Sequence, residues 1–354
     1  MTQRLNKLFR TFDANKIDAL LVGSGPNVTY LSGFKGSDSW LLISPKSLYF
    51  ITDSRYAEQA RKEAKGFKVV LRDGKCVSEV VADLVGKKRS ACLGFEGQHT
   101  SYAFYIRLER TLGPGKLQAT KDLVEDLRQT KDAFEISQIR KSAGIAVRGF
   151  HYIKQVVRPG MTEREAQGRL EYFTKSIGAE KPAFDIIIAS GARSSMPHCQ
   201  TNDTIIKDNN LALVDMGVVY QGYHSDLTRP IFLGRISPFH KRIYRVVRQA
   251  QAAGIRKAAP GVAVKEVDAA CRYWIKKSGY GRYFSHGTGH GVGLQIHEAP
   301  TVSSRSSAVL KPGMVITVEP GIYLPGKFGI RIEDMVLITN KGNEVLTRDL
   351  DKSV

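Results

Sequence analysis

The sequence lacks any apolar run that approaches the ~18 residues of a membrane-spanning helix. Its first residues predict an amphipathic helix and a short strand, and they lack the continuous apolar stretch of a secretory signal peptide. Its four cysteines are scattered and form no recognisable pairing or metal-binding motif. We therefore expect a cytoplasmic protein, in a reducing compartment, that does not enter a membrane.

Acidic residues are few compared with basic ones. The 354 residues include 53 Lys and Arg against 34 Asp and Glu, for a formal net charge of +19. Such a balance can indicate nucleic-acid binding. The basic residues are dispersed through predicted helices, however, and no run of five like charges and no nucleic-acid motif is present. We interpret the charge as a solvated surface, expect no specific nucleic-acid partner, and leave weak binding to polyanions at low salt open.

Helical and strand patterns alternate along residues 1–125, which is typical of an α/β domain. Their polar residues form no metal cluster, so we expect this domain to be a scaffold or to gate substrate. A linker is expected over Gly113–Gln118, which contains GPGK. The predicted helices cover residues 3–14, 27–31, 54–65, 78–85 and 102–111, and the predicted strands cover 18–22, 40–43, 47–51, 67–71 and 91–95.

Residues 126–354 have the pattern of an α+β domain, an antiparallel sheet backed by helices. Asp132 and Glu135 form a capping box for a long helix, which Pro159-Gly160 ends. Thr162 caps a second helix, and further helices start at Ser237-Pro238 and near Lys265. Short turns such as YQGY, PGKFG and NKGN join the strands between them, and short turns connect antiparallel neighbours.

The most informative residues are five of the types that bind metal ions, all in the last 140 positions. They lie in strands or Gly-rich loops, where a buried charge has no obvious structural purpose. Burying four carboxylates together costs several kcal/mol per charge unless cations neutralise them. The carboxylates therefore imply metal ions. The five residues are Asp215, Asp226, His290, Glu319 and Glu333.

Their spacing predicts that the carboxylates face each other in pairs. Asp215 and Asp226 each lie five residues from a turn centred on Tyr220-Gln221, so an ideal hairpin places them opposite each other. Glu319 and Glu333 each lie seven residues from Gly326 and repeat the arrangement. Like charges in such positions are destabilising unless a cation lies between them. The two hairpins have the same arrangement of paired carboxylates, which we interpret as a weak internal duplication folded around one site.

The donor set indicates the metal. His290 lies in HGTGHGVG, where the glycines permit close backbone approach, and neutral imidazole is a common ligand. Four carboxylates and one imidazole suit Mn²⁺, with Co²⁺ or Zn²⁺ as alternatives. Two such ions can share a hydroxide nucleophile and polarise a carbonyl.

The remaining polar residues divide into two groups. His198, His286 and His297 lie beside the loops that form the predicted site, and we regard them as functional candidates. Six others lack motif context. We expect the four histidines among them to be surface or core residues and the two acids to be solvated edge charges: His99, His151, His224, His240, Glu298 and Asp334.

These motifs resemble metallopeptidase family M24, whose catalytic domain has the pita-bread fold. Within the family they resemble the Xaa-Pro peptidases, aminopeptidase P and proline dipeptidase (prolidase). NVTYLSGFKGSDSWLLI and TDSRYAEQA are similar to the creatinase-type N-terminal domain of that subgroup, expected here over residues 1–125. LRQTKDAFEISQIRKSA resembles the opening of the catalytic domain, expected over 126–354. VDMG, HSDLTRP, GTGHGVGLQIHE, TVEPGIY and GIRIED are specific in combination, and the resemblance covers almost the whole chain.

The resemblance implies a role for each metal ligand. Asp215 would bind one ion, and His290 with Glu319 would bind the other. Asp226 and Glu333 would bridge the two ions. Glu319 would also carry a proton from the attacking water to the leaving nitrogen.

The resemblance also implies five residues around the substrate. His297 would donate a hydrogen bond to the developing oxyanion. His198 and His286 would line the subsite for the residue after the scissile bond. Arg331 would support the bridging glutamate and the substrate side. Tyr323 would lie near the proline pocket.

The sequence therefore predicts a dinuclear-metal exopeptidase that cleaves Xaa-Pro bonds. We expect aminopeptidase P, because the chain is compact and has no long insertion between Glu319 and Glu333. Prolidase is the alternative. Methionine aminopeptidase, a creatinase-like hydrolase and a non-catalytic pita-bread binding protein fit less well, since all five ligands and an N-terminal domain are present. We expect a homodimer, and peptides or dipeptides with proline in second position as substrates.

Overall fold

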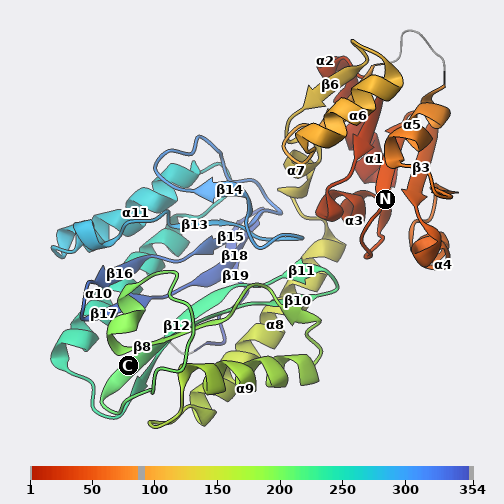
Figure 1. Cartoon of the computed structure of the whole chain (residues 1–354). Coiled ribbons are helices and arrows are strands. Elements are labelled where there is room, and N and C mark those ends of the chain that lie inside the picture. The colour runs from red at the N-terminus through yellow and green to blue at the C-terminus, as the bar shows by residue number, and fades with distance from the viewer. Residues whose placement is uncertain (1, 87–91, 351–354) are drawn as a thin grey trace. The chain divides into compact units, whose positions relative to one another are not determined.

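The computed structural model describes residues 2–86 and 92–350 of the chain. The chain divides into two compact units, an N-terminal unit of Met1–Arg128 and a C-terminal unit of Gln129–Val354 (Figure 1). Among the described residues, no helix has both the length and the apolar character needed to cross a membrane.

The described part of the N-terminal unit is built on a mixed six-stranded sheet in the order β4-β3-β2-β1-β5-β6. The β1–β2 and β2–β3 pairs are antiparallel, and β3–β4, β1–β5 and β5–β6 are parallel. This arrangement confirms the predicted α/β class. The strands are β1 Ala19–Val22, β2 Trp40–Ser44, β3 Ser47–Thr52, β4 Lys68–Leu71, β5 Leu93–Glu96 and β6 Leu117–Thr120. The helices are α1 Thr2–Phe9, α2 Phe12–Asn15, α3 Gly25–Ser32, η1 Ser54–Tyr56, α4 Ala57–Glu63, α5 Val77–Val85, α6 Tyr102–Leu112 and α7 Leu123–Arg128.

Two predictions for this unit were wrong. The helix expected over residues 3–14 is interrupted, because the Thr11 hydroxyl donates to the carbonyl of Leu8 and competes with the helical bonds. The linker expected over Gly113–Gln118 runs into β6, whose residues Leu117–Thr120 pair in parallel with β5. The turn before β6 holds Gly113 and Gly115 at φ values of 92° and 76°, so the glycines reverse the chain within the unit. Residue 91, the predicted start of one strand, lies outside the described residues.

The C-terminal unit combines antiparallel sheets with helices, as predicted. Its described strands form sheets in the orders β12-β9-β8, β11-β10-β7, β14-β13-β15-β18-β19 and β16-β17. The helices are α8 Ala133–Val156, α9 Glu163–Ser176, η2 Gly191–Ser195, α10 Pro238–Lys257, α11 Val264–Lys277 and η3 Gly281–Tyr283. The strands are β7 Lys181–Pro182, β8 Ile187–Ser190, β9 Asn210–Met216, β10 Val218–Tyr220, β11 Tyr223–His224, β12 Leu227–Leu233, β13 Gly289–Gly291, β14 Glu298–Val302, β15 Val315–Val318, β16 Gly321–Leu324, β17 Phe328–Arg331, β18 Asp334–Thr339 and β19 Gly342–Val345.

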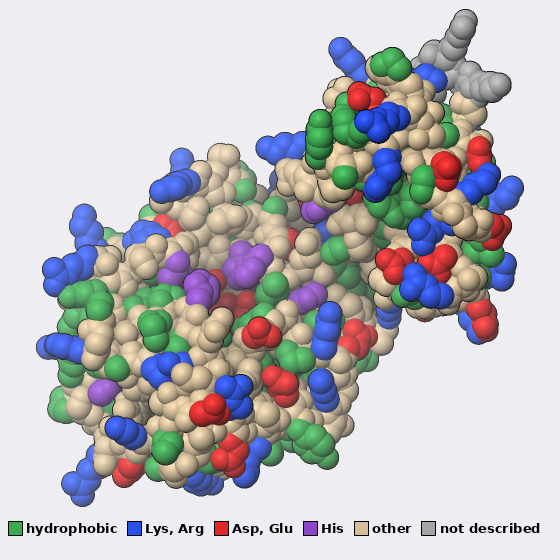
Figure 2. Space-filling view, in the orientation of Figure 1, with side chains coloured by type: hydrophobic (Ala, Val, Ile, Leu, Met, Phe, Trp, Pro, Cys, Tyr) green, Lys and Arg blue, Asp and Glu red, His purple; other side chains and the backbone are tan. Residues whose placement is uncertain are grey.

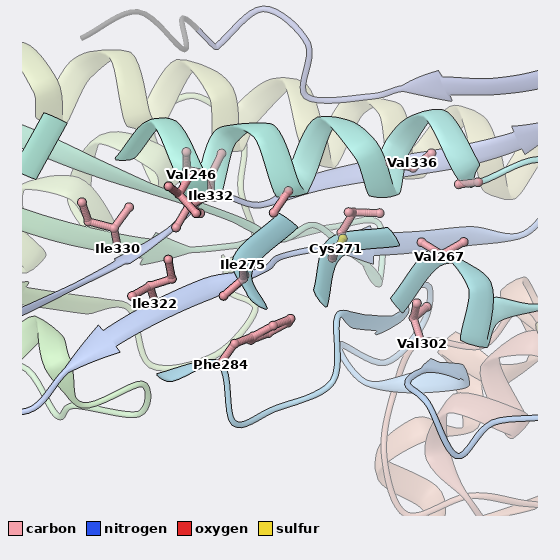
Figure 3. Packing of buried hydrophobic residues seen from close by; sticks show 14 of the residues in the cluster. Val246, Val267, Cys271, Ile275, Phe284, Val302, Ile322, Ile330, Ile332 and Val336 are labelled. Carbon is pink, nitrogen blue, oxygen red and sulfur yellow. The ribbon is translucent and has the colours of Figure 1, made fainter. Parts of the chain in front are cut away.

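Two helix pairs cover the strands that carry the predicted site. Residues of α8 and α9 share one apolar core with β8, β9, β10 and β12. Residues of α10 and α11 share a second core with β15, β16, β17 and β18. In Figure 3, Val246 of α10 and Ile275 of α11 lie close to Ile322 and Ile330 of the β16–β17 hairpin. Each pair of helices therefore supports one of the two hairpins that carry the acidic residues.

The predicted helix starts are present. The Asp132 side chain accepts from the amide of Glu135, and the Glu135 side chain accepts in return from the amide of Asp132. Thr162 and Ser237 cap α9 and α10 by accepting from amides three residues later. Such caps each contribute about 1 kcal/mol and fix where the helices begin.

Candidate metal centre

The five residues that the sequence singled out lie on strands or directly beside them. Asp215 lies in β9, and Asp226 comes just before β12. His290 is the middle residue of β13, Glu319 follows β15, and Glu333 stands between β17 and β18. On the face drawn in Figure 2, histidine side chains gather around a hollow in the C-terminal unit, with acidic side chains at its floor.

The prediction for the first hairpin was wrong in its register. The turn is Gln221-Gly222, with φ values of 52° and 80°, rather than Tyr220-Gln221. Moving a turn by one residue moves the cross-strand partner by two, so Asp215 lies opposite Thr228 and not opposite Asp226. Thr228 lies in β12 and Asp226 just before it, two residues apart, so both point to the same face if the extended chain continues, and the two aspartates are diagonal neighbours.

The prediction for the second hairpin was correct. Val318 pairs with Asp334 on one side of the two glutamates, and Gly321 pairs with Arg331 on the other side. Both pairs follow one register, which places Glu319 opposite Glu333. Glu319 lies between β15 and β16, and Glu333 lies between β17 and β18, where the β15–β18 pairing gives way to the β16–β17 pairing.

Three of the five residues form a compact group of possible ligands. One ligand atom from each of Asp226, His290 and Glu333 lies within 4.8 Å of the others. Nε2 of His290 is 3.6 Å from Oδ2 of Asp226 and 3.4 Å from Oε1 of Glu319. Glu319 therefore adjoins this group through His290.

Asp215 is joined to the group by Thr228 and Arg331. The Thr228 hydroxyl lies 2.6 Å from Oε2 of Glu333 and 3.1 Å from Oδ1 of Asp215, and it accepts from Nε of Arg331 at 3.0 Å. Nη2 of Arg331 donates to Oδ2 of Asp215 at 2.5 Å. The Arg331 Nε atom is 3.9 Å from Glu319 Oε2. Arg331 thus donates a hydrogen bond directly to Asp215 and is linked to Glu333 by hydrogen bonds through Thr228.

Burial and mutual repulsion make these carboxylates hard to ionise. Burial, followed by the charges of Glu333 and Asp215, raises the pKa of Asp226 well above its usual range. Burial, followed by the charges of Glu319 and Asp215, raises the pKa of Glu333 in the same way. Burial raises the pKa of Glu319 to about 7, although Arg331 acts in the opposite direction. A bound cation would reverse these shifts.

The residues present fit divalent metal ions. Oε1 of Glu333 is a buried acceptor without a hydrogen-bond donor among the described residues. Burial lowers the pKa of His290 to about 4, so its ring is neutral at physiological pH, and its Nδ1 lies 3.1 Å from the carbonyl of Gly291. This contact suits Nδ1–H as the donor and leaves Nε2 as a ligand. An orphaned carboxylate oxygen and a free imidazole nitrogen aimed at other carboxylates are the donors that a cation requires.

Two acidic residues expected to be solvated are buried in ion pairs. Asp334 is fully buried and accepts from Nη2 of Arg229 at 2.6 Å. The same Arg229 also donates to the carbonyls of Thr228 and Glu333. It therefore connects the strand that carries Thr228 to the segment that carries Glu333. The Glu298 side chain, 8% exposed, pairs with Nζ of Lys131 at 2.7 Å. A charge of opposite sign nearby, which a strand pattern does not reveal, explains both burials.

Three of the expected substrate residues, His297, His286 and Tyr323, are linked by ring or hydrogen-bond contacts to a candidate ligand or to Arg331. The His297 ring lies 4.4 Å from the His290 ring, and burial followed by His198 lowers the His297 pKa. Nε2 of His286 is 3.0 Å from the Tyr323 hydroxyl, which accepts from Nη1 of Arg331.

The side chains around the site differ in exposure. His198 and His297 are exposed, whereas Tyr323 is buried. Burial, followed by the charge of Arg331, lowers the pKa of His286 to about 4. The site therefore has exposed imidazoles at its rim, with the neutral ring of His286 and a buried phenol further inside.

The other four histidines have local partners. His99 contacts Glu125, His151 reaches a carbonyl, and His240 stacks on Phe328. His224 packs beside the site, with its amide donating to the carbonyl of Gly293. Thr228 and Arg229, which contact the predicted ligands, were not identified from the sequence. The signal was present in HSDLTRP, since strand alternation puts Thr228 on the same face as Asp226.

Family models match both units. Residues 137–340 match the model of metallopeptidase family M24, and residues 4–130 match the model of the Creatinase/Prolidase N-terminal domain. All five candidate ligands lie within the first match.

Similar proteins cover the whole chain. A Xaa-Pro dipeptidase of Pyrococcus horikoshii is 38% identical and aligns over 98% of this chain and 97% of its own length. The solved structure of a Xaa-Pro dipeptidase from Bacillus anthracis is 40% identical, covers 99% of this chain and 98% of its own, and has a TM-score of 0.95. The solved structure of an X-Pro aminopeptidase from Thermotoga maritima is 37% identical, covers 97% and 99%, and has a TM-score of 0.90.

Proposed function

Because this chain belongs to metallopeptidase family M24, we propose that it is a proline dipeptidase that hydrolyses Xaa-Pro dipeptides at a two-metal centre. The observation that carries the proposal is the buried cluster of acidic side chains around His290, in which Oε1 of Glu333 has no donor among the described residues. Relatives named Xaa-Pro dipeptidase, which match nearly the full chain, supply the substrate class.

The five candidate ligands divide between the two ions as follows. Asp215 would hold one ion, His290 and Glu319 would hold the other, and Asp226 and Glu333 would contact both. Mn²⁺ fits this oxygen-rich set best, with Co²⁺ or Zn²⁺ as alternatives. Bound in this way, the ions would lower the pKa of water and polarise the scissile carbonyl.

The remaining chemistry belongs to the side chains. Glu319 would accept the proton of the attacking water and deliver it to the proline nitrogen, which must be protonated to leave. His297, exposed beside His290, would donate a hydrogen bond to the oxygen of the scissile carbonyl as negative charge develops there. Arg331 would keep Asp215 and the Thr228 hydroxyl in position through bonds of 2.5 Å and 3.0 Å.

Recognition of proline would rest on shape. An Xaa-Pro bond has no N–H, and the proline ring fixes φ, so an extended binding mode based on that N–H is unavailable. His198, His286 and Tyr323 offer imidazole and phenol surfaces for the flat apolar ring. The imidazole N–H groups of His198 and His286 also suit the free carboxylate of a dipeptide.

The relatives change the preferred reading of the substrate. The compact sequence alone favoured aminopeptidase P, but the relative and the structure with Xaa-Pro dipeptidase in their names favour the alternative, prolidase. Aminopeptidase P remains the second candidate, because the similar Thermotoga maritima structure is an X-Pro aminopeptidase. We also propose that the protein is a homodimer and works in the cytoplasm. Light scattering on the purified protein measures its molar mass and tests the dimer.

A parallel assay with Mn²⁺-loaded protein tests the substrate. Ala-Pro, Ala-Ala and Arg-Pro-Pro are incubated separately, and free proline, alanine and arginine are followed. Cleavage of Ala-Pro with little cleavage of the other two supports a proline dipeptidase. Release of arginine from Arg-Pro-Pro at a comparable rate supports aminopeptidase P instead. Cleavage of Ala-Ala as fast as Ala-Pro contradicts proline selectivity.

A further inference from the structure

The positive charge of the chain is concentrated on one helical hairpin. Residues 235–283 contain twelve Lys and Arg against two acidic residues, a net charge of +10 out of the +19 of the whole chain. This segment, about a seventh of the sequence, comprises α10, α11 and η3. In Figure 2, Lys and Arg side chains line the margin of the C-terminal unit where Figure 1 places α10 and α11.

Three basic side chains of α10 project from one face. The helix has no Asp or Glu in its 20 residues. Lys241, Arg245 and Arg248 are exposed, follow one another at i, i+4 and i+7, and line a shallow depression together with Tyr244 and Gln249. The rise between these positions is about 6 Å and then about 4.5 Å. Along the axis of a double helix the charges of one strand are ~3.4 Å apart, and its neighbouring phosphates lie farther apart than that through space, so basic groups at this spacing can reach neighbouring phosphates of one strand.

The two acidic residues of the segment are paired within the hairpin and do not neutralise its other basic side chains. Asp268 is fully buried and binds Nε of Arg272 at 2.7 Å. Glu266 binds Nζ of Lys257 at 2.8 Å. Both negative charges are matched inside the hairpin, and α11 adds three further exposed lysines, Lys265, Lys276 and Lys277.

The hairpin also presents aromatic rings beside its charges. Tyr273 is 58% exposed, and Nζ of Lys277 lies 5.7 Å from its ring and 5.6 Å from that of Trp274. Exposed aromatic rings next to basic groups are the elements with which proteins bind single strands, since bases stack on the rings while phosphates meet the charges.

The apolar face of α10 is already occupied. Ile243, Val247 and Ala250 are buried in the core of the C-terminal unit, and Gly254 lies so close to α11 that an added Cβ would be 2.4 Å from Sγ of Cys271. A helix that binds in a membrane interface needs its apolar face for the lipid. The outward face of α10 could therefore bind a membrane only through its charges. A single strand of nucleic acid could contact both the charges of the hairpin and its exposed aromatic ring.

We propose that the exposed basic face of α10 and α11 binds single-stranded nucleic acid without sequence preference. This function lies apart from peptide hydrolysis. Recognition is by phosphate contacts from the lysines and arginines and by stacking on Tyr273. Binding is salt-dependent, because each phosphate contact releases counterions.

The test is fluorescence anisotropy with a labelled 20-nucleotide oligouridylate, titrated at 50, 100 and 150 mM salt. The variant Lys241→Gln/Arg245→Gln/Lys276→Gln removes three charges from the proposed face. We expect at least about a 10-fold weaker Kd at the lowest salt, and a salt slope shallower by about 2, since each single-strand contact contributes ~0.7. The matched control, Arg148→Gln/Lys154→Gln/Lys175→Gln, removes three exposed charges from α8 and α9 and should change the Kd by less than about 3-fold.

Two further measurements identify the ligand class. Tyr273→Ala should weaken oligouridylate binding by about 5-fold or more, because stacking is lost, and leave binding of inorganic polyphosphate unchanged. Vesicles of phosphatidylglycerol test the membrane alternative at the same salt.

Four outcomes would overturn the proposal. They are no oligonucleotide binding by the unaltered protein at 50 mM salt, an equal loss in the control variant, no effect of Tyr273→Ala, and tighter binding to the vesicles than to the oligonucleotide.

Discussion

The hydroxyl of Thr228 lies 2.6 Å from Oε2 of Glu333, in a position that also reaches Asp215 and Arg331. The side chain is fully buried, so water cannot replace its hydroxyl easily. One hydroxyl thus connects a carboxylate from each acidic hairpin.

The first prediction concerns this hydroxyl. Thr228→Val keeps the shape of the side chain and leaves Nε of Arg331 and Oε2 of Glu333 without this partner. We expect Mn²⁺ affinity, measured by titration calorimetry, to fall about 10-fold or more, the usual effect of losing a group that orients metal ligands. Thr228→Ser keeps the hydroxyl and should retain most of the affinity. Equal affinities for the valine variant and the unaltered protein would show that Thr228 does not position the ligands.

The second prediction concerns Glu319 as proton carrier. Glu319→Ala removes the group assigned to move a proton and one ligand, so the rate of Ala-Pro hydrolysis should fall more than about 100-fold. The control is Glu344→Ala, which removes an acid whose partner is Arg140 in an ion pair on the surface. The control should hydrolyse Ala-Pro at nearly the original rate. Near-full activity of Glu319→Ala would contradict the mechanism.

The third prediction concerns pH and metal removal. Burial raises the pKa of Glu319 to about 7 and the pKa values of Asp226 and Glu333 above their usual range. The same carboxyls ionise near pH 4 in an unfolded chain. Between about pH 4.5 and 7 the folded, metal-free protein therefore binds more protons than the unfolded chain, and its stability falls as pH rises through this window.

Calorimetry at pH 5 and pH 8 measures this effect. The rise in Tm on adding Mn²⁺ should be larger at pH 8, where the carboxylates are ionised and repel each other in the metal-free protein and where protons no longer compete with the ion. A Tm increase that is equal at both pH values, or larger at pH 5, would mean that these carboxyls do not hold the metal.

The fourth prediction concerns the ion pair behind the site. Asp334→Ala leaves Arg229 buried without its carboxylate, in a pair whose side chains are 0% and 2% exposed. Removing one partner of such a pair costs about 3–5 kcal/mol. Glu344→Ala, which breaks the partly exposed pair with Arg140, should cost less than about 1 kcal/mol. Urea unfolding of the metal-free proteins compares the two, and equal losses would contradict the assigned role of Arg229 and Asp334.

Much of the fold followed from local signals. The capping box at Asp132, the N-caps Thr162 and Ser237, and the Pro159-Gly160 helix end depend on neighbours within a few positions, and these signals placed both ends of α8 and the starts of α9 and α10 close to where they are observed. The second acidic hairpin was predicted correctly, since a glycine marks its turn and both flanking ladders share one register.

The errors arose where distant residues decide the outcome. The first hairpin was shifted because Gln221 adopts a positive φ, which the sequence of a non-glycine residue does not announce. The buried state of Asp334 depends on Arg229, more than 100 positions away. Alternation in HSDLTRP puts Thr228 on the same face as Asp226, but Thr228 was missed because the shifted register hid its place opposite Asp215.

The most direct test of the central claim is an anomalous difference map from crystals grown with Mn²⁺. The account predicts two peaks inside the cluster, with Asp226 and Glu333 contacting both, Asp215 contacting one, and His290 with Glu319 contacting the other. A map without a peak among these five residues, or with a single peak that leaves Asp215 or His290 uncoordinated at saturating metal, would contradict the two-metal centre.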